Sequence, residues 1–214
     1  MNIFLTGSSS GIGQAVKQLL DHQEHMVTAP TRHELDLSDF AAIDSLDLSQ
    51  YDVVVNCAGV NQGAYMGWHD NSWQNQQHHV AVNYTGPLLL AKQYTRQRTK
   101  GQFVYITSSG ADDPISYTIF MIGSKIALRQ SLNAVKRDYP GILFTEIVPG
   151  KTRTNMLRQN YQGTRSDQDI AEEYARGPVL DPGQVAHTIA LAIELKLDRV
   201  GISPQKNTNH KEKL

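Results

Sequence analysis

Cysteine, long apolar runs and net charge are all scarce in this chain of 214 residues, and each scarcity excludes a class of protein. The single cysteine, Cys57, excludes an internal disulfide framework and fits a reducing, cytoplasmic compartment. No apolar run approaches the ~20 residues that span a bilayer, so we expect no membrane partner. The formal net charge of −1 gives no indication of nucleic acid as a partner.

Metal-binding and targeting signals are also scarce. His78 and His79 are adjacent, and neighbours on a helix point apart, so we expect no metal site there. A glycine-rich stretch begins almost at once after an apolar run at residues 3–5, so we expect no signal peptide before it. The length fits one domain, which we assign to residues 1–205, followed by a polar tail at residues 206–214.

The most informative stretch is a glycine-rich turn between a predicted strand and a predicted helix. It reads Thr6-Gly7-Ser8-Ser9-Ser10-Gly11-Ile12-Gly13. The strand is the apolar run at residues 3–5, and apolar residues at helical spacing follow from Ile12 to Leu20. Glycines allow close approach of the backbone to an anion, and the unpaired N–H groups of a helix N-terminus bind phosphate. The stretch therefore predicts a nucleotide-phosphate site.

Strand-like and helix-like segments alternate along the chain. We predict seven strands, at residues 3–5, 25–29, 35–37, 51–59, 102–106, 142–148 and 199–203. Long helices are expected at residues 80–97, where Pro87 predicts a kink or a fresh start, and at residues 119–139. Asp39 or Ser38 and, later, Asp181 are expected to cap helices. This alternation predicts one compact α/β domain, a doubly wound parallel sheet of the Rossmann type with ligands at the carboxyl ends of its strands.

The residues after the second predicted strand indicate which dinucleotide is bound. An acidic residue there binds the ribose hydroxyls of NAD, whereas an arginine accommodates the extra phosphate of NADP. Here Pro30-Thr31-Arg32 follows the strand, and the first carboxylate is Glu34. We therefore expect Arg32 to bind the 2′-phosphate and NADP(H) to be favoured over NAD(H). The alternative is a solvated loop arginine.

These motifs together resemble the short-chain dehydrogenase/reductase family, in its short single-domain form, over nearly the whole chain. The turn at residues 6–13 fits the family's Thr-Gly-x-x-x-Gly-x-Gly cofactor motif at every fixed position. Asp36-Leu37 resembles the pair that contacts the adenine, and Asn56-Cys57-Ala58-Gly59 is similar to the family's Asn-Asn-Ala-Gly. Pro149-Gly150-Lys151-Thr152-Arg153-Thr154 resembles the segment around the nicotinamide, where Thr154 would touch the amide or the pyrophosphate.

The resemblance implies hydride transfer between a nicotinamide and a carbonyl or alcohol. The family uses a serine, a tyrosine and a lysine, the last two spaced Tyr-x-x-x-Lys, with a supporting asparagine. Ser108, Lys125 and Asn83 occupy the matching positions. The tyrosine position holds Met121, and a thioether has no exchangeable proton and is neither acid nor base.

Met121 leaves three interpretations open. In the first, the protein is an oxidoreductase whose proton comes from Tyr117, one helical turn earlier, or from water bound at Lys125 or Ser108. In the second, it binds NADP with weak or no catalysis and acts as a sensor or scaffold. In the third, Met121 reflects an altered sequence. We favour the first because the serine, the lysine and the asparagine are all retained.

Residues 151–177 are polar and weakly periodic, so we expect a substrate lid there. The chain is short for the family, and the loss at its C-terminal end puts the family's usual tetramer interface in doubt. A homodimer through the helices at residues 80–97 and 119–139 is the expected assembly. We expect the partners to be a nicotinamide dinucleotide and a small-molecule substrate.

Overall fold

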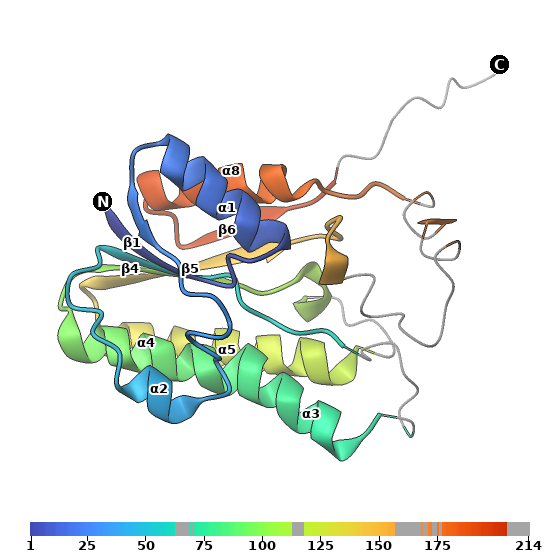
Figure 1. Ribbon diagram of the computed structural model, residues 1–214, viewed down its shortest axis with the longest axis horizontal. Coiled ribbons are helices and arrows are strands. Elements are labelled where there is room, and N and C mark those ends of the chain that lie inside the picture. Colours follow the sequence, from blue (N-terminus) through green and yellow to red (C-terminus); the bar gives the residue numbers. More distant parts are fainter. Residues whose placement is uncertain are drawn as a thin grey trace.

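The computed structural model describes residues 1–62, 69, 71–112, 118–156, 168, 171–172, 175 and 177–204. Its centre is a parallel sheet of six strands in the order β2-β1-β3-β4-β5-β6 (Figure 1). The strands are β1 (Asn2–Thr6), β2 (Met26–Thr28), β3 (Val53–Asn56), β4 (Gly101–Ile106), β5 (Ile142–Pro149) and β6 (Arg199–Ile202). Helices cover both faces, so the predicted doubly wound Rossmann architecture is confirmed.

The two helix layers follow from the alternation of apolar side chains along the strands. α1 (Gly11–His22) and α8 (Pro182–Glu194) cover one face of the sheet, where Ile3 and Leu5 of β1 are buried. α2 (Phe40–Asp44), α3 (Trp73–Val80), α4 (Gly86–Gln97) and α5 (Ile119–Asp138) lie on the other side, where Phe4 and Val54 are buried. Full burial of each such side chain stabilises the fold by ~1.5–3 kcal/mol. The stable sheet fixes the positions of the residues at its carboxyl edge.

The strand predicted at residues 35–37 does not form, so the sheet has six strands rather than seven. The backbone N–H groups of Glu34 and Leu35 donate to the carbonyl oxygen of Thr31, at 3.1 and 2.9 Å, and this closes a turn. Leu35 and Leu37 are nevertheless buried in the core. Their apolar spacing reflects burial of a loop, and β2 is left as an edge strand.

The helix predicted at residues 80–97 starts earlier and is interrupted. α3 runs directly into a π-helical segment, Ala81–Thr85, and α4 begins at Gly86. Pro87 lies in the first turn of α4, where a residue without an N–H group is tolerated. The fresh start that Pro87 predicts is therefore confirmed.

Helix caps fall where the sequence predicts them. Asp39 accepts a hydrogen bond from the N–H of Ala42 (3.0 Å) at the start of α2, and Asp181 forms a capping box with Gln184 at the start of α8. No helix in the described part of the chain is long and apolar enough to cross a membrane. The predicted tail at residues 206–214 lies outside the described residues.

Candidate active site

The glycine-rich turn joins β1 to α1 through conformations that glycine adopts readily. Gly7 and Gly11 have φ angles of +75° and +55°. A Cβ added at Gly13 would lie 2.1 Å from the carbonyl oxygen of Gly7, so a side chain there would displace the turn. The hydroxyl of Ser10, just before α1, makes no capping hydrogen bond within the described residues. The first N–H groups of α1 are therefore available to an anion.

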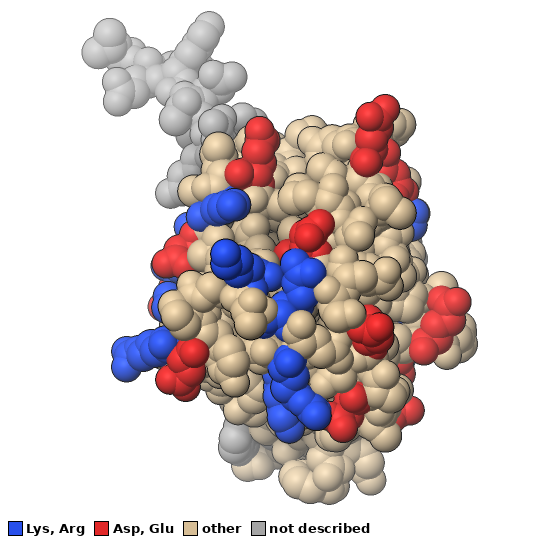
Figure 2. Space-filling model, turned by 90° about the vertical axis from the view of Figure 1, so that its left-hand side faces the viewer, with Lys and Arg blue, Asp and Glu red and all other residues tan. Residues whose placement is uncertain are grey.

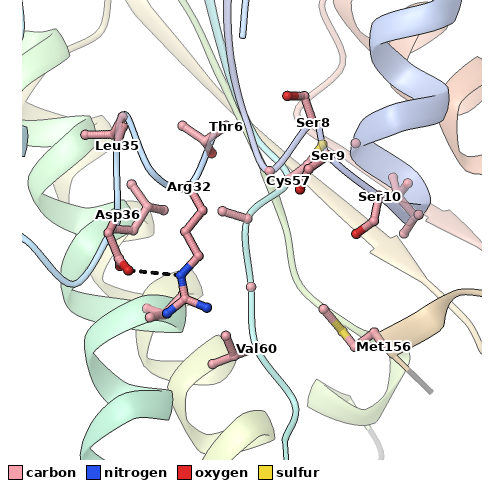
Figure 3. A pocket seen from close by; sticks show the side chains of 18 of the residues that line it. Thr6, Ser8, Ser9, Ser10, Arg32, Leu35, Asp36, Cys57, Val60 and Met156 are labelled. Atoms are coloured by element: carbon pink, nitrogen blue, oxygen red, sulfur yellow. Dashed lines mark hydrogen bonds and ion pairs between the residues drawn. The ribbon is translucent and has the colours of Figure 1, made fainter. Parts of the chain in front are cut away.

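A cavity of about 190 Å³ opens beside this turn, at the carboxyl ends of β1 and β3. Figure 3 shows Arg32 and Asp36 on one side of it and the three serines of the turn on the other. The predicted cofactor residues that line it are Thr6, Gly7, Ser8, Ser9, Ser10, Gly11, Ile12, Gly13, Arg32, Asp36, Leu37, Ala58, Gly59 and Thr154. Asn56 is not among the lining residues, because it is buried and its Oδ1 accepts a hydrogen bond from the Thr6 hydroxyl (2.6 Å).

An ion pair orients Arg32 at this cavity. Its Nε lies 3.0 Å from Oδ2 of Asp36, and 65% of the Arg32 side chain is exposed (Figure 3). Partial burial alone would raise the pKa of Asp36, but hydrogen bonds from Ser38 and the nearby charge of Arg32 outweigh it and lower the pKa to about 2. Asp36 is therefore ionised at neutral pH, where it both orients the guanidinium and offsets part of its charge.

A second cavity, of about 360 Å³, adjoins the first. The two have Ile12, Cys57, Ala58, Gly59, Thr154 and Met156 in common. Beyond these shared residues, the predicted site residues that line the second cavity are Ser108, Met121, Lys125, Pro149, Gly150 and Thr152. The structure thus brings most of the predicted cofactor residues together with Ser108, Met121 and Lys125 in two adjoining cavities.

Lys125, on α5, is a basic side chain that lines the second cavity. Its Nζ donates a hydrogen bond to the carbonyl oxygen of Ile106, at the end of β4 (2.9 Å). Burial disfavours the ammonium form and lowers the pKa of Lys125 to about 8. Burial also raises the pKa of the Cys57 thiol to about 12, so this neighbour is uncharged at neutral pH. A lysine of this kind exchanges a proton near neutral pH, as a general acid requires.

Ser108 and Met121 line the second cavity together with Lys125. Ser108 precedes a short 3₁₀ turn, Ser109–Ala111, and its Oγ accepts a hydrogen bond from the N–H of Gly110 (3.2 Å). Accepting this bond leaves its hydroxyl proton available to a ligand oxygen. Met121 offers only a partly buried thioether, and Tyr117, the predicted substitute, lies outside the described residues.

Asn83 lies beside the two cavities rather than in their lining. It belongs to the π-helical segment, is buried, and both accepts from the N–H of Val60 and donates to its carbonyl oxygen (2.8 Å each). A Cβ added at Gly59 would lie 3.2 Å from the Asn83 Oδ1. The side chain therefore holds the backbone after β3, and Val60 itself lines the first cavity.

The segment from Pro149 to Thr154 follows β5 along the other side of the second cavity. The N–H of Gly150 donates to the carbonyl oxygen of Ile202 in β6 (2.8 Å), and the Thr152 hydroxyl donates to the carbonyl oxygen of Gly150 (2.9 Å). Thr154 reaches the glycine-rich turn, where its Cγ2 is 3.1 Å from a Cβ added at Gly11. These contacts join the two ends of the site.

Sequence reasoning missed two side chains that line both cavities, Cys57 and Met156. Cys57 lies within a quoted motif, so its position at the end of a buried strand was a usable signal. Met156 follows Thr154 by two residues, and nothing in the sequence marks it.

The opposite end of the sheet has a different character. Figure 2 views the molecule from the amino ends of the strands, and Lys and Arg side chains gather near the middle of this face. A hollow of about 840 Å³ there is lined by Arg98, Lys100, Lys136 and Lys196, among others. No predicted site residue lines it, and this agrees with ligand binding at the carboxyl ends of parallel strands.

The sheet order, the glycine-rich turn and the joined cavities define the Rossmann class of dinucleotide-binding folds. Residues 9–195 match the family described as Enoyl-(Acyl carrier protein) reductase. The chain therefore belongs to the short-chain dehydrogenase/reductase family.

The individual relatives share only about a quarter of their aligned residues with this chain. The chain is 25% identical over 200 residues to human Dehydrogenase/reductase SDR family member 7, a match that covers 76% of this chain but only 58% of that protein. It is 27% identical over 208 residues to 2,3-dihydro-2,3-dihydroxybenzoate dehydrogenase of Bacillus subtilis (strain 168), covering 81% of this chain and 77% of that protein.

Two solved structures have the same fold as this chain. A serine dehydrogenase complexed with NADP+ superimposes with a TM-score of 0.84 at 19% identity, covering 97% of each chain. A small-chain dehydrogenase in complex with NADPH gives a TM-score of 0.81 at 18% identity, covering 95% of this chain and 96% of that one. At such identities the likeness establishes the fold alone.

Proposed function

We propose that the protein is an NADP(H)-dependent oxidoreductase that interconverts a carbonyl and an alcohol. The observation that carries the proposal is the continuity of the two cavities, with the phosphate turn in one and Ser108 and Lys125 in the other. Family membership supports the reaction class, and the site supports the roles of the individual residues.

The site fits a nicotinamide dinucleotide at several points. Gly13 has no room for a side chain because the Gly7 backbone lies against it, as expected for the glycine that lets the helix of a dinucleotide-binding fold pack closely on the first strand. Arg32 would bind the 2′-phosphate, and Asp36 with Leu37 would border the adenine. Thr154 and the segment from Pro149 would border the nicotinamide end, with the Lys125 ammonium at the ribose. When bound, the cofactor supplies or accepts the hydride.

The proton must come from a group other than Met121. We infer that the Ser108 hydroxyl holds the substrate oxygen and that Lys125, directly or through a water molecule, supplies its proton. Because burial lowers the pKa of Lys125 to about 8, the protonated form required for reduction dominates below that pH and disappears above it. Tyr117 is the alternative proton donor.

Met121 also favours a second candidate function: a protein that binds NADP(H) but turns over slowly or not at all, as a sensor or scaffold. Losing a general acid lowers the rate of turnover by ~10²–10⁴-fold. A protein with such slow turnover would act mainly by binding the cofactor. Lys125 would then serve only to hold the ribose.

A panel of carbonyl substrates tests these roles in the wild type, Met121→Tyr, Tyr117→Phe and Lys125→Met. If Lys125 supplies the proton, Lys125→Met loses turnover and Tyr117→Phe keeps it. Loss in Tyr117→Phe alone would assign the proton to Tyr117. Turnover that appears only in Met121→Tyr, with NADPH bound equally by the wild type, would support the binding protein.

We further infer a lid at residues 151–177 and a homodimer through α4 and α5. The lid is supported by its polar composition and by the position of Thr152 and Thr154 at the cavity, although most of residues 157–176 lie outside the described residues. Limited proteolysis with and without NADPH tests the lid, and sedimentation tests the dimer. A reducing, cytoplasmic setting fits the single thiol, Cys57.

A further inference from the structure

Two arginines that are distant in the sequence bridge the same two carboxylates. Arg129 of α5 donates from Nε to Oε1 of Glu146 (2.6 Å) and from Nη1 to Oδ1 of Asp112 (2.8 Å). Arg199, the first residue of β6, donates from Nε to Oε2 of Glu146 (2.9 Å) and from Nη2 to Oδ2 of Asp112 (2.7 Å). The four side chains form a closed ring of alternating charge, which we call the arginine–carboxylate ring.

The ring has a buried half and an exposed half. Only 5% of the Glu146 side chain and 12% of the Arg129 side chain are exposed, whereas Asp112 and Arg199 are about half exposed, at 50% and 51%. A buried carboxylate needs a paired cation, so Glu146 is a fixed anchor inside the fold. Asp112 lies on the outer side and is held in place by the guanidiniums.

The ring holds both ends of the segment that contains Ser108. At one end, the Thr107 hydroxyl donates to Oε1 of Glu146 (2.6 Å), and Thr107 is buried. At the other end is Asp112, directly after the 3₁₀ turn. Ser108 and the turn Ser109–Ala111 lie between these two anchors, and Ser108 lines the second cavity.

We propose that Arg129 and Arg199 are positioning residues, which fix the direction of the Ser108 hydroxyl by clamping Thr107 and Asp112 through the arginine–carboxylate ring. The clamp makes the edge strand β6 part of the catalytic support, because Arg199 begins that strand. Its catalytic consequence rests on the proposed oxidoreductase function, whereas its effect on the segment does not.

The physical reason is the small size of the turn. The segment between the anchors is stabilised by two backbone hydrogen bonds, from Ala111 N–H to the carbonyl oxygen of Ser108 (2.9 Å) and from Asp112 N–H to that of Ser109 (3.1 Å). Such a short turn opens readily on its own, so its order depends on what holds its ends. A hydroxyl that binds a reacting oxygen must keep its direction to within 10–20°, roughly, and a clamp at both ends provides this.

The exchange rates of backbone amides test the clamp and need no substrate. In Arg199→Met we expect the amides of Gly110, Ala111 and Asp112 to exchange about tenfold faster, because one charged anchor of Asp112 is lost. Asp112→Asn, which keeps the shape but removes the charge, should raise the same rates. The amide of Gly150, which donates to the carbonyl oxygen of Ile202 (2.8 Å), reports on the pairing of β5 with β6 and should keep its rate.

Arg96→Met is the matched control. Arg96 is an exposed arginine on α4 that pairs with Asp44 at 3.2 Å, and it neither belongs to the ring nor lines either cavity of the site. Faster exchange in Arg199→Met and Asp112→Asn but not in Arg96→Met supports the clamp. Unchanged rates at the three turn amides in Arg199→Met, or an equal rise at Gly150, would overturn it, since Arg199 would then only stabilise the sheet edge.

A kinetic readout separates the catalytic consequence from the structural one. With any carbonyl that the wild type reduces, Arg199→Met should lower kcat about tenfold and leave the Kd for NADPH unchanged, because no cofactor-lining residue belongs to the ring. An unchanged kcat would overturn the positioning role even if the turn exchanges faster. If no carbonyl is reduced at all, the oxidoreductase proposal fails while the exchange experiment still decides the clamp.

Discussion

Replacing Arg32 by methionine should reduce the preference for NADPH over NADH and leave NADH binding unchanged. The guanidinium lies at the cavity that we assign to the adenosine half of the cofactor, and only the NADP form has a 2′-phosphate for it. Methionine keeps most of the length of the side chain and removes its charge. The change therefore tests charge recognition more than packing.

The structure sets the size of the effect. A charge-assisted hydrogen bond contributes ~1.5–3 kcal/mol, but the Arg32 side chain is 65% exposed and is paired with Asp36 at 3.0 Å. Solvent screening and this pairing both reduce the value, so we expect about 1–2 kcal/mol, which corresponds to a roughly 5–30-fold weaker Kd for NADPH. NADH should change less than twofold or so, because it has no phosphate at that position.

The assay is a pair of fluorescence titrations, with NADPH and with NADH, on the wild type and Arg32→Met. Lys17→Met is the matched control, because Lys17 is also an exposed cation in an i,i+4 ion pair, with Asp21 at 2.7 Å, but lines neither cavity. Equal weakening of both cofactors would show that Arg32 only orders the loop. No weakening of NADPH would refute the reasoning outright.

Three further predictions concern the catalytic half and the glycine-rich turn. Met121→Tyr should raise carbonyl reduction by ~10²–10⁴-fold if the missing phenol limits the rate, measured as kcat/KM. The wild-type reduction rate should be constant at low pH and fall through about pH 8 as Lys125 loses its proton, since burial lowers its pKa. Gly13→Ala should abolish cofactor binding, because its Cβ would meet the Gly7 carbonyl oxygen at 2.1 Å. Gly123→Ala in α5 is the contrasting change: its Cβ would have nothing within 4 Å, so it should raise the free energy of unfolding by about 0.5–1 kcal/mol.

Most of the fold follows from local pattern, and the exceptions have local causes. The segments that became β1, β3, β4 and β5 each contain at least three consecutive apolar residues, a pattern that is typical of strands buried on both faces of a parallel sheet. Leu35 and Leu37 alternate with Asp36, which also fits a strand, yet hydrogen bonds to Thr31 close that segment into a turn. Two apolar residues are too few to distinguish a strand from a buried loop.

The sequence predicts those parts of the site that consist of short motifs. It does not predict the ion pairs between side chains that are distant in the sequence. Residues 6–13 and Ser108 follow the ends of parallel strands, so the rule that ligands bind at these ends predicts that they lie together. Lys125, on α5, was expected beside them from its family motif. The arginine–carboxylate ring joins residues from four segments, and no spacing encodes it. Glu146 inside an apolar strand was its one visible signal, because a charge there requires a partner.

For Asn83, the sequence predicts the residue but not the backbone conformation that positions its side chain. Its identity and position were expected, but the π-helical segment that directs its amide to Val60 was not. A π turn depends on how neighbouring helices pack, and Pro87 marked only the restart of the helix.

The most direct test of the central claim follows a labelled hydride. NADPH deuterated at C4 of the nicotinamide is incubated with the protein and a panel of carbonyl compounds, and the products are analysed by mass spectrometry. We expect deuterium on the carbinol carbon of at least one product, and a rate at least roughly 10²-fold lower in Lys125→Met. NADPH that binds tightly while no carbonyl acquires deuterium would contradict the oxidoreductase and leave the binding protein.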